Sequence, residues 1–293
     1  MKKGFIDVTG GKVWYKIVGE DKNNTPLLVL HGGPGIPHDY LEGLEVLADE
    51  RPVIFYDQLG SGNSDKTNDK SLWTVEHYVE ELDHVRQFLK LETLHILGQS
   101  WGTMLAVEYM LRKPPTGIKS LILSGPALSI SRWIKDQRAY LKELPRETQA
   151  CITECEKNKD FKSEKYRKAI DIYYHKHVCQ MDPWPECLNR SLMKMNPDIY
   201  EYMCGPSEFT VSGTLKSFER AEDLKNIKTP VLYTCGRYDE ATPESTAYYK
   251  NLTPNAEMVI FEDASHEHHL EKKEEFIKTA REFLNRDVSH LIN

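Results

Sequence analysis

Short apolar runs alternate with amphipathic stretches in the first 125 residues of the chain. Nearly continuous apolar runs bounded by Gly, Pro or Asp are typical of strands that are buried on both faces of a parallel sheet. Such runs occupy residues 27–30, 53–56, 94–97 and 121–123. Between them, residues 75–89 carry apolar side chains at three- and four-residue spacing, which predicts a helix. This alternation indicates an α/β fold with right-handed crossovers.

The pattern changes after residue 125, where helical stretches replace the strands. We expect helices at residues 131–144, 147–157, 163–178 and 185–195. Strand patterns resume at residues 231–234 and 258–261, and an amphipathic helix at 271–284 follows them. At the other end of the chain, residues 5–18 alternate around Gly10-Gly11 and predict an edge hairpin.

The return of strands after a helical segment predicts one interrupted core. We assign residues 1–125 and 223–293 to the α/β core and residues 126–222 to an inserted helical cap. The insertion is also rich in aromatic residues, namely Trp133, Tyr140, Tyr166, Tyr173, Tyr174 and Trp184.

Composition narrows the class of protein without choosing a function. The chain has 293 residues, 40% of them hydrophobic and 28% charged, with a net charge of −7. The longest apolar runs are about four residues, whereas a membrane-spanning helix needs roughly 20, so we expect no membrane span. The acidic balance argues against nucleic acid as a partner. Six cysteines are too few for a disulfide scaffold, and no apolar stretch follows the first basic residues, so we expect a cytoplasmic protein.

The strongest chemical signal is the pentapeptide Gly-Gln-Ser-Trp-Gly at residues 98–102. It follows the strand pattern at 94–97 and opens a helix that is expected to end near Pro114-Pro115. In this context G-x-S-x-G predicts a nucleophile elbow, a tight turn that projects the serine hydroxyl above the sheet. Ser100 is therefore the expected nucleophile, and the alternative is an ordinary turn serine.

A serine nucleophile needs a base and an orienting carboxylate, which follow it in the chain as Asp or Glu and then His. Asp239 lies just past the strand pattern at 231–234, and His266 lies just past the pattern at 258–261. Both thus fall at carboxyl ends of strands, where active sites of open α/β sheets collect. The alternatives are a turn residue for Asp239 and a surface-loop histidine for His266.

His268 and His269 compete with His266 for the role of base. His266 is favoured because it comes first after the strand, whereas the other two are expected to line the start of the following helix. A metal site is a poorer explanation, since this cluster has neither H-x-x-x-H nor H-E-x-x-H spacing.

An oxyanion hole should accompany the nucleophile. One expected donor is the backbone N–H of Trp101, the residue after the nucleophile. The second is expected from the string His-Gly-Gly-Pro-Gly at residues 31–35. Pro34 has no N–H, so Gly33 is the favoured donor.

The strings at residues 31–35, 57–64 (Asp-Gln-Leu-Gly-Ser-Gly-Asn-Ser) and 98–102 together resemble the proline iminopeptidase family. This branch of the α/β-hydrolases includes the aminopeptidase factor that works with tricorn protease. The similarity extends to Gly-Pro-Ser-Glu-Phe-Thr at 205–210 and to residues 236–243. The resemblance implies an α/β-hydrolase fold with a mostly parallel central sheet and an inserted helical cap. Family members release an N-terminal residue, often proline, from short peptides, and some relatives are amidases or esterases.

The resemblance also implies that Glu208 and Glu240 hold the free ammonium group of the substrate. A buried ammonium must be paired, and two carboxylates would supply charge-assisted hydrogen bonds. The alternative for each is a solvated surface glutamate. The chain departs from many relatives at Thr103, where they carry a second glycine after Gly102. We expect Thr103 to leave the triad intact and to reshape the pocket floor.

The leading hypothesis is thus a serine exopeptidase that acts through Ser100, His266 and Asp239 on short peptides with a free N-terminus. The cap would limit substrate size, and its aromatic residues would form an apolar wall for a proline ring. No cofactor is expected, and the cysteines of the insertion are interpreted as buried or incidental thiols. The alternatives are a small-molecule amidase, esterase or lactonase, and an inactive binding protein on the same fold. The oligomeric state stays open.

Overall fold

One mixed sheet forms the centre of the molecule in the computed structural model, which describes residues 1–286. Its strands run in the order β1-β2-β4-β3-β5-β6-β7-β8. They are β1 (Lys2–Val8), β2 (Gly11–Val18), β3 (Leu27–Leu30), β4 (Val53–Tyr56), β5 (Leu94–Gln99), β6 (Ile118–Ser124), β7 (Val231–Gly236) and β8 (Ala256–Phe261). The β1–β2 hairpin is antiparallel and forms one edge, β2 pairs antiparallel with β4, and the remaining pairs are parallel. The mostly parallel sheet and the edge hairpin are confirmed.

Helices cover both faces of this sheet. The core helices are α1 (Val75–Phe88), α2 (Trp101–Arg112), α8 (Pro243–Leu252), α9 (His268–Glu271) and α10 (Lys273–Leu284), with 3-10 helices η1 (His38–Asp49) and η2 (Lys70–Leu72). Successive side chains of a strand point to opposite faces. Leu28 and Leu30 accordingly pack with apolar residues of α1, α2 and α8. Leu27 and Val29 pack with residues of η1 and α10 on the other face. No helix in residues 1–286 is long and apolar enough to cross a membrane.

The segment between β6 and β7 is helical, as its pattern predicts. It contains α3 (Ile130–Leu141), α4 (Arg146–Asn158), α5 (Glu164–His177), α6 (Glu186–Lys194) and α7 (Pro197–Met203), followed by η3 (Thr214–Ser217) and η4 (Ala221–Asn226). The first four helices match the expected ones, although the first ends three residues early at Leu141. The pattern did not predict α7, which has only seven residues.

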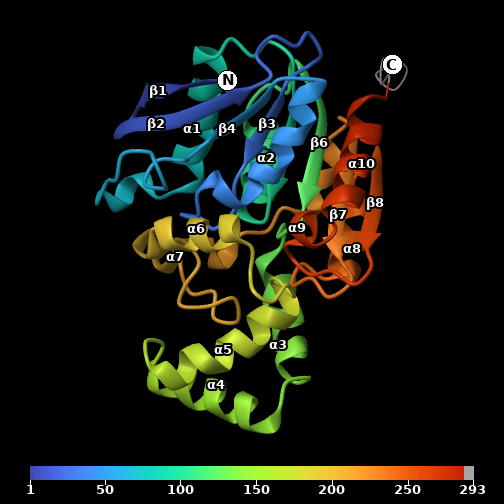
Figure 1. Ribbon diagram of the computed structural model, residues 1–293. Coiled ribbons are helices and arrows are strands. Elements are labelled where there is room, and N and C mark those ends of the chain that lie inside the picture. The colour runs from blue at the N-terminus through green and yellow to red at the C-terminus, as the bar shows by residue number, and fades with distance from the viewer. Residues whose placement is uncertain (287–293) are drawn as a thin grey trace.

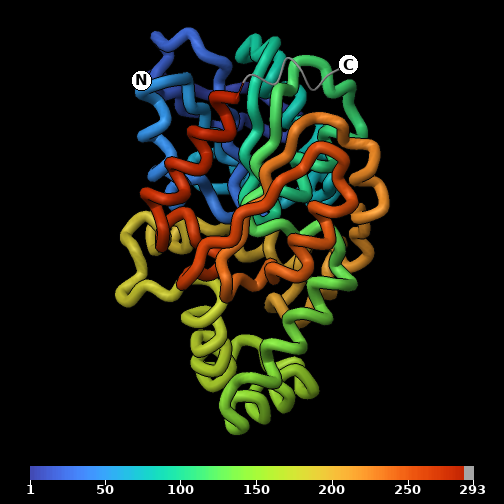
Figure 2. Tube along the Cα trace, turned by 90° about the vertical axis from the view of Figure 1, so that its right-hand side faces the viewer, coloured from blue at the N-terminus to red at the C-terminus, as the bar shows by residue number. Residues whose placement is uncertain are grey.

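The inserted helices gather at one end of the molecule. Helices α3, α4 and α5 project as a lobe, and α6 and α7 lie between this lobe and the sheet (Figure 1). Figure 2 shows the same lobe from the side, at the end opposite the N-terminus. The lobe has an apolar cluster of its own, which includes Ile152, Tyr166 and Tyr173. The last seven residues assigned to the core, 287–293, lie outside the described residues.

Candidate active site

Ser100 occupies a strained turn between β5 and α2. Its φ of +54° and ψ of −121° lie outside the regions that L residues favour, and such strain is concentrated at functional sites. A side chain at Gly98 would collide with the carbonyl oxygen of Gly102, and one at Gly102 with that of Leu30. The two glycines therefore allow the backbone to pack closely enough to form the turn, as the elbow motif requires.

Asp239 and His266 meet at the carboxyl ends of the neighbouring strands β7 and β8. Nδ1 of His266 lies 2.7 Å from Oδ1 of Asp239. The Asp239 carboxylate is fully buried and also accepts the backbone N–H groups of Gly236 (3.1 Å) and Ala241 (2.7 Å). Burial alone would raise the pKa of Asp239, but the charge of His266 and its hydrogen bonds outweigh this effect and lower the pKa to about 2. Asp239 is thus an ionised group that orients the imidazole.

The second ring nitrogen of His266 makes no hydrogen bond to the described residues. Its Nε2 is buried, has no hydrogen-bond partner among the described residues, and lies 3.6 Å from Oε1 of Glu240. No hydrogen bond joins it to Ser100 within the described chain, although both residues line one cavity. Such contacts are often long without substrate. Burial opposes the charged imidazole, but the negative charges of Asp239, Glu240 and Glu267 raise the pKa of His266 to about 10.

The competing histidines have other partners. His268 is fully buried, and its Nε2 contacts the hydroxyl groups of Ser124 (2.9 Å) and Thr234 (3.0 Å). Nε2 of His269 lies 3.2 Å from the carbonyl oxygen of Tyr40, and burial lowers the pKa of His269 to about 3. Both residues lie in the short helix α9, which directly precedes α10, so they line the start of the terminal helix as expected; neither lines the cavity that Ser100 lines.

The expected oxyanion donors flank Ser100. Trp101 is the first residue of α2, so its N–H is one of the helix amides that have no partner inside the helix. Gly33 lines the cavity beside Ser100 with a φ of +106°, and a Cβ at this position would lie only 2.7 Å from the backbone nitrogens of Gly35 and Ile36. Glycine is thus required where the loop turns toward Ser100.

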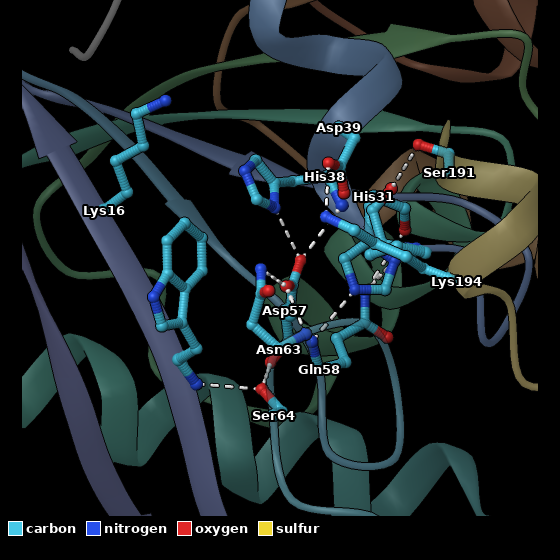
Figure 3. A network of polar contacts seen from close by, with 12 residues as sticks. Lys16, His31, His38, Asp39, Asp57, Gln58, Asn63, Ser64, Ser191 and Lys194 are labelled. Atoms are coloured by element: carbon cyan, nitrogen blue, oxygen red, sulfur yellow. Dashed lines mark hydrogen bonds and ion pairs between the residues drawn. The ribbon is translucent and has the colours of Figure 1, made fainter. Parts of the chain in front are cut away.

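A polar network holds the loop that contains Gly33 (Figure 3). Nε2 of His31 accepts the backbone N–H of Gln58 (2.9 Å), and Oε1 of Gln58 accepts the indole N–H of Trp101 (2.8 Å). Burial lowers the pKa of His31 to about 4, which keeps its ring neutral and able to accept. Oδ1 of the buried Asp57 accepts the backbone N–H of His38 (3.0 Å). The loops after β3 and β4 are therefore joined to the start of α2.

Glu208 and Glu240 lie in the same cavity as Ser100. Glu208 follows α7, faces the cavity and accepts a hydrogen bond from the Tyr200 hydroxyl. Glu240 is only 4% exposed, and the Tyr173 hydroxyl donates to it at 3.4 Å. Burial raises the pKa of both carboxyl groups, and in Glu240 the charge of Glu208 adds to the effect. Neither residue is a solvated surface glutamate.

The cavity has a volume of about 190 Å³ and is mostly apolar. Apart from Gly33 and the polar groups already described, its lining includes Ile36, Tyr40, Gln99, Tyr174, Val178, Trp184, Leu188, Leu192, Met195 and Glu267. The aromatic wall is thus partly as expected, since Tyr174 and Trp184 contribute to it. Tyr140 instead stacks on His177 at 3.9 Å, and Tyr166 packs inside the lobe. Sequence reasoning did not identify Tyr200 or Glu267.

Thr103 does not reach the cavity, so the expectation that it reshapes the pocket floor is wrong. Its side chain is fully buried and donates to the carbonyl oxygen of Ser100 at 2.6 Å. The hydroxyl oxygen of Thr103, Oγ1, also accepts a hydrogen bond from the backbone N–H of Ala127 at 3.3 Å. Thr103 therefore ties the strained turn to the loop after β6.

The cysteines do not form a cross-link or a metal site in residues 1–286. All six have free thiols, including Cys151 and Cys155 on neighbouring turns of α4. No group of three or more His, Cys, Asp or Glu in the described chain is arranged to hold a metal ion.

Comparison with known proteins agrees with this geometry. A family model described as alpha/beta hydrolase fold matches residues 25–273. The proline iminopeptidase of Heyndrickxia coagulans is 48% identical over 284 residues, covering 97% of this chain and 98% of the relative. That of Lactobacillus acidophilus is 39% identical, with coverage of 97% and 98%.

Solved structures show the same relationship. The proline iminopeptidase of Mycobacterium smegmatis superposes with a TM-score of 0.89 at 34% identity and 97% coverage of both chains. VinJ superposes with a TM-score of 0.93 at 32% identity, covering 97% of this chain and 98% of VinJ. Similarity of this extent over nearly the full length shows that the chain belongs to the proline iminopeptidase family of the α/β-hydrolases.

Proposed function

We propose that this protein is a serine exopeptidase that releases the N-terminal residue, preferentially proline, from short peptides through an acyl-enzyme. One observation carries the proposal: the buried carboxyl groups of Glu208 and Glu240 line the same cavity as Ser100 and His266. A hydrolase acting on a neutral ester has no use for two such groups, whose burial is costly without a cation. The α-ammonium group of a peptide supplies that cation.

The reaction follows from the positions of the groups. Ser100 Oγ attacks the scissile carbonyl carbon while Nε2 of His266 takes its proton, and Asp239 stabilises the imidazolium that forms. The N–H groups of Gly33 and Trp101 hold the oxyanion of the tetrahedral intermediate. His266 then gives the proton to the leaving amine, and water hydrolyses the acyl-enzyme by the same steps.

The carboxylates restrict the reaction to the first peptide bond. With the ammonium held by Glu208 and Glu240, only the adjacent carbonyl group reaches Ser100, because both carboxyl groups line the same cavity as Ser100 and a longer amino-terminal segment would carry its ammonium past them. Residues 126–222 act as the cap in this proposal, since they supply Glu208 and much of the wall. The free thiols fit a reducing compartment, and we place the protein in the cytoplasm.

Substrate binding also acts on the base. The charge of Glu240 contributes to the raised pKa of His266. A bound ammonium offsets that charge, which lowers the pKa of His266 and favours the neutral imidazole that takes the Ser100 proton.

The test compares Pro-arylamide with its N-acetylated form. We expect efficient hydrolysis of the free amine and at least a hundredfold lower kcat/KM for the acetylated substrate, since the buried carboxylates are then left unpaired. Equal values would reject the ammonium site and favour an esterase or amidase of small molecules.

A pair of variants tests whether Glu208 binds the substrate ammonium. Glu208→Gln should lower kcat/KM on the free-amine arylamide far more than on a simple acetate ester. Glu201→Gln is the matched control, because Glu201 is an exposed glutamate on the neighbouring helix α7. An equal loss on both substrates would mean that Glu208 supports the fold instead.

A further inference from the structure

Glu267 is a buried carboxyl group in the cavity that the proposed reaction does not use. It follows His266 directly, lines the cavity and is only 5% exposed. No described residue donates a hydrogen bond to its side-chain carboxyl group, and Oε2 is fully buried without a partner. Native proteins rarely leave a buried carboxylate in this state.

Glu271, one turn further along the chain, is a carboxylate with a structural role and has several hydrogen-bond donors. It accepts the backbone N–H groups of Gln180 and Ser265, both at 2.7 Å, and the Ser265 hydroxyl at 3.0 Å. Glu271 therefore fastens the loop after β8 to the end of α5. Glu267 has no comparable role in the fold.

Within residues 1–286, the protein offers Glu267 no cation other than the imidazole of His266. Nε2 of His269 is 3.6 Å from Oε2, but burial lowers the pKa of His269 to about 3, so its ring is neutral. No Lys or Arg side chain of residues 1–286 lies within 4 Å of the carboxylate. Burial raises the pKa of Glu267 to about 8, an effect that the charge of His266 only partly offsets. A cation supplied by the ligand would stabilise the ionised form of the Glu267 carboxyl group.

The carboxyl groups of Glu267 and Glu240 have different neighbours, although the two backbone N–H groups donate to the adjacent carbonyl oxygens of Val178 (2.8 Å) and His177 (3.3 Å). The Glu240 carboxyl group contacts the Tyr173 hydroxyl of α5, in the lobe. Oε2 of Glu267 instead lies 3.6 Å from Nε2 of His269, which is 3.2 Å from the carbonyl oxygen of Tyr40 in η1. The backbone N–H of Tyr40 in turn donates to the hydroxyl of Ser191 on α6 (2.8 Å).

Helix α6 forms the open side of the cavity. Leu192 of α6 is 37% exposed and is the most exposed of the lining residues. A peptide whose ammonium is held in the buried part must extend toward this opening. The residue after the scissile bond then passes the side on which Glu267 lies.

We propose that Glu267 is a specificity-determining residue that binds a positively charged side chain, Lys or Arg, on the residue following the scissile bond. The inference rests on the proposed exopeptidase function and adds a second cation-binding position to it. A carboxylate that pairs with an ammonium or guanidinium group forms charge-assisted hydrogen bonds, which are about twice as strong as neutral ones. Removing the charge from Glu267 or from the substrate side chain should therefore remove the preference for a basic residue at this position.

The experiment measures release of free proline from Pro-Lys-Gly and from Pro-norleucine-Gly, which keeps the aliphatic chain without the ammonium group. For the wild-type enzyme we expect kcat/KM to be about tenfold higher with lysine, the factor that one charge-assisted contact provides. Glu267→Gln should bring this ratio close to one, and Glu267→Asp should retain part of it. Glu201→Gln, on the exposed surface of α7, should leave the ratio unchanged.

The alternatives give different results. A wild-type ratio near one, or a ratio unchanged in Glu267→Gln, would overturn the inference while leaving the exopeptidase function intact. An equal loss on both peptides with a shifted pH profile would also overturn it, because Glu267 would then act through His266. Failure of the wild-type enzyme on both peptides, with hydrolysis of simple esters retained, would reject the proposed function itself.

Discussion

Replacing Gly125 by alanine should displace His266, the proposed catalytic base. Gly125 follows β6 with a φ of +60°, and a Cβ at this position would lie 2.6 Å from Cε1 and 2.7 Å from Nδ1 of His266. Restoring ordinary contact at 3.4 Å requires the ring to move by about 0.8 Å, which would break its hydrogen bond with Asp239. Misplacement of a catalytic group by about 1 Å costs on the order of 10²-fold in rate.

We therefore expect Gly125→Ala to lower kcat on a free-amine Pro-arylamide about 10²-fold, which corresponds to about 2.7 kcal/mol. The left-handed backbone should add about 1 kcal/mol of destabilisation, measurable by thermal denaturation. Gly43→Ala is the control, because its Cβ would meet only the flexible end of the Lys273 side chain, no closer than an ordinary 3.5 Å, so kcat should stay within about twofold of wild type. A folded Gly125→Ala enzyme with wild-type kcat would refute the reasoning.

Three further substitutions test other parts of the site and core. Glu240→Gln removes a negative charge that raises the pKa of His266, so the acid limb of the pH profile for hydrolysis of a neutral ester should move to lower pH; an unmoved limb would contradict this. Thr103→Val removes the hydrogen bond to the Ser100 carbonyl and should cost about 1–2 kcal/mol in urea denaturation, whereas wild-type stability would show that the bond contributes nothing. Burial raises the pKa of Glu81 to about 8, so the folded protein binds the Glu81 proton more tightly than the unfolded chain does. The free energy of unfolding therefore falls as the pH rises from 4.5 through 8. Glu81→Gln should therefore stabilise the protein more at pH 9 than at pH 5, by about 1–3 kcal/mol in urea titrations, and an equal effect at both pH values would count against the assignment.

The sheet and the main site residues were predictable because they depend on local pattern and chain order. An apolar run predicts a strand such as β7 wherever it falls, and the residue just past its end lies at the edge where sites form. Asp239 and His266 are therefore found from position alone, and the structure brings them to 2.7 Å. The helices of the insertion are amphipathic enough for the same reasoning to find α3 to α6.

Other features depend on contacts between distant segments. Thr103 carries no sign that its hydroxyl bridges the nucleophile turn and Ala127, because the partners are set by how α2 packs on β6. Glu267 is one of several glutamates in its segment, and only the fold shows that it is buried without a donor while Glu271 is fully paired. The short helix α7 has too few residues for a periodic pattern to stand out.

The separate apolar cluster of the lobe has a consequence for how the molecule loses function. Tyr173 belongs to this cluster and also contacts Glu240, whereas Asp239 and His266 lie in the loops that follow β7 and β8 of the sheet. Segments with their own core can open independently of the rest of a protein. Partial melting of the lobe would therefore loosen the proposed ammonium site while the proposed triad persists. On gentle heating or in mild denaturant, the enzyme should become promiscuous before it becomes inactive.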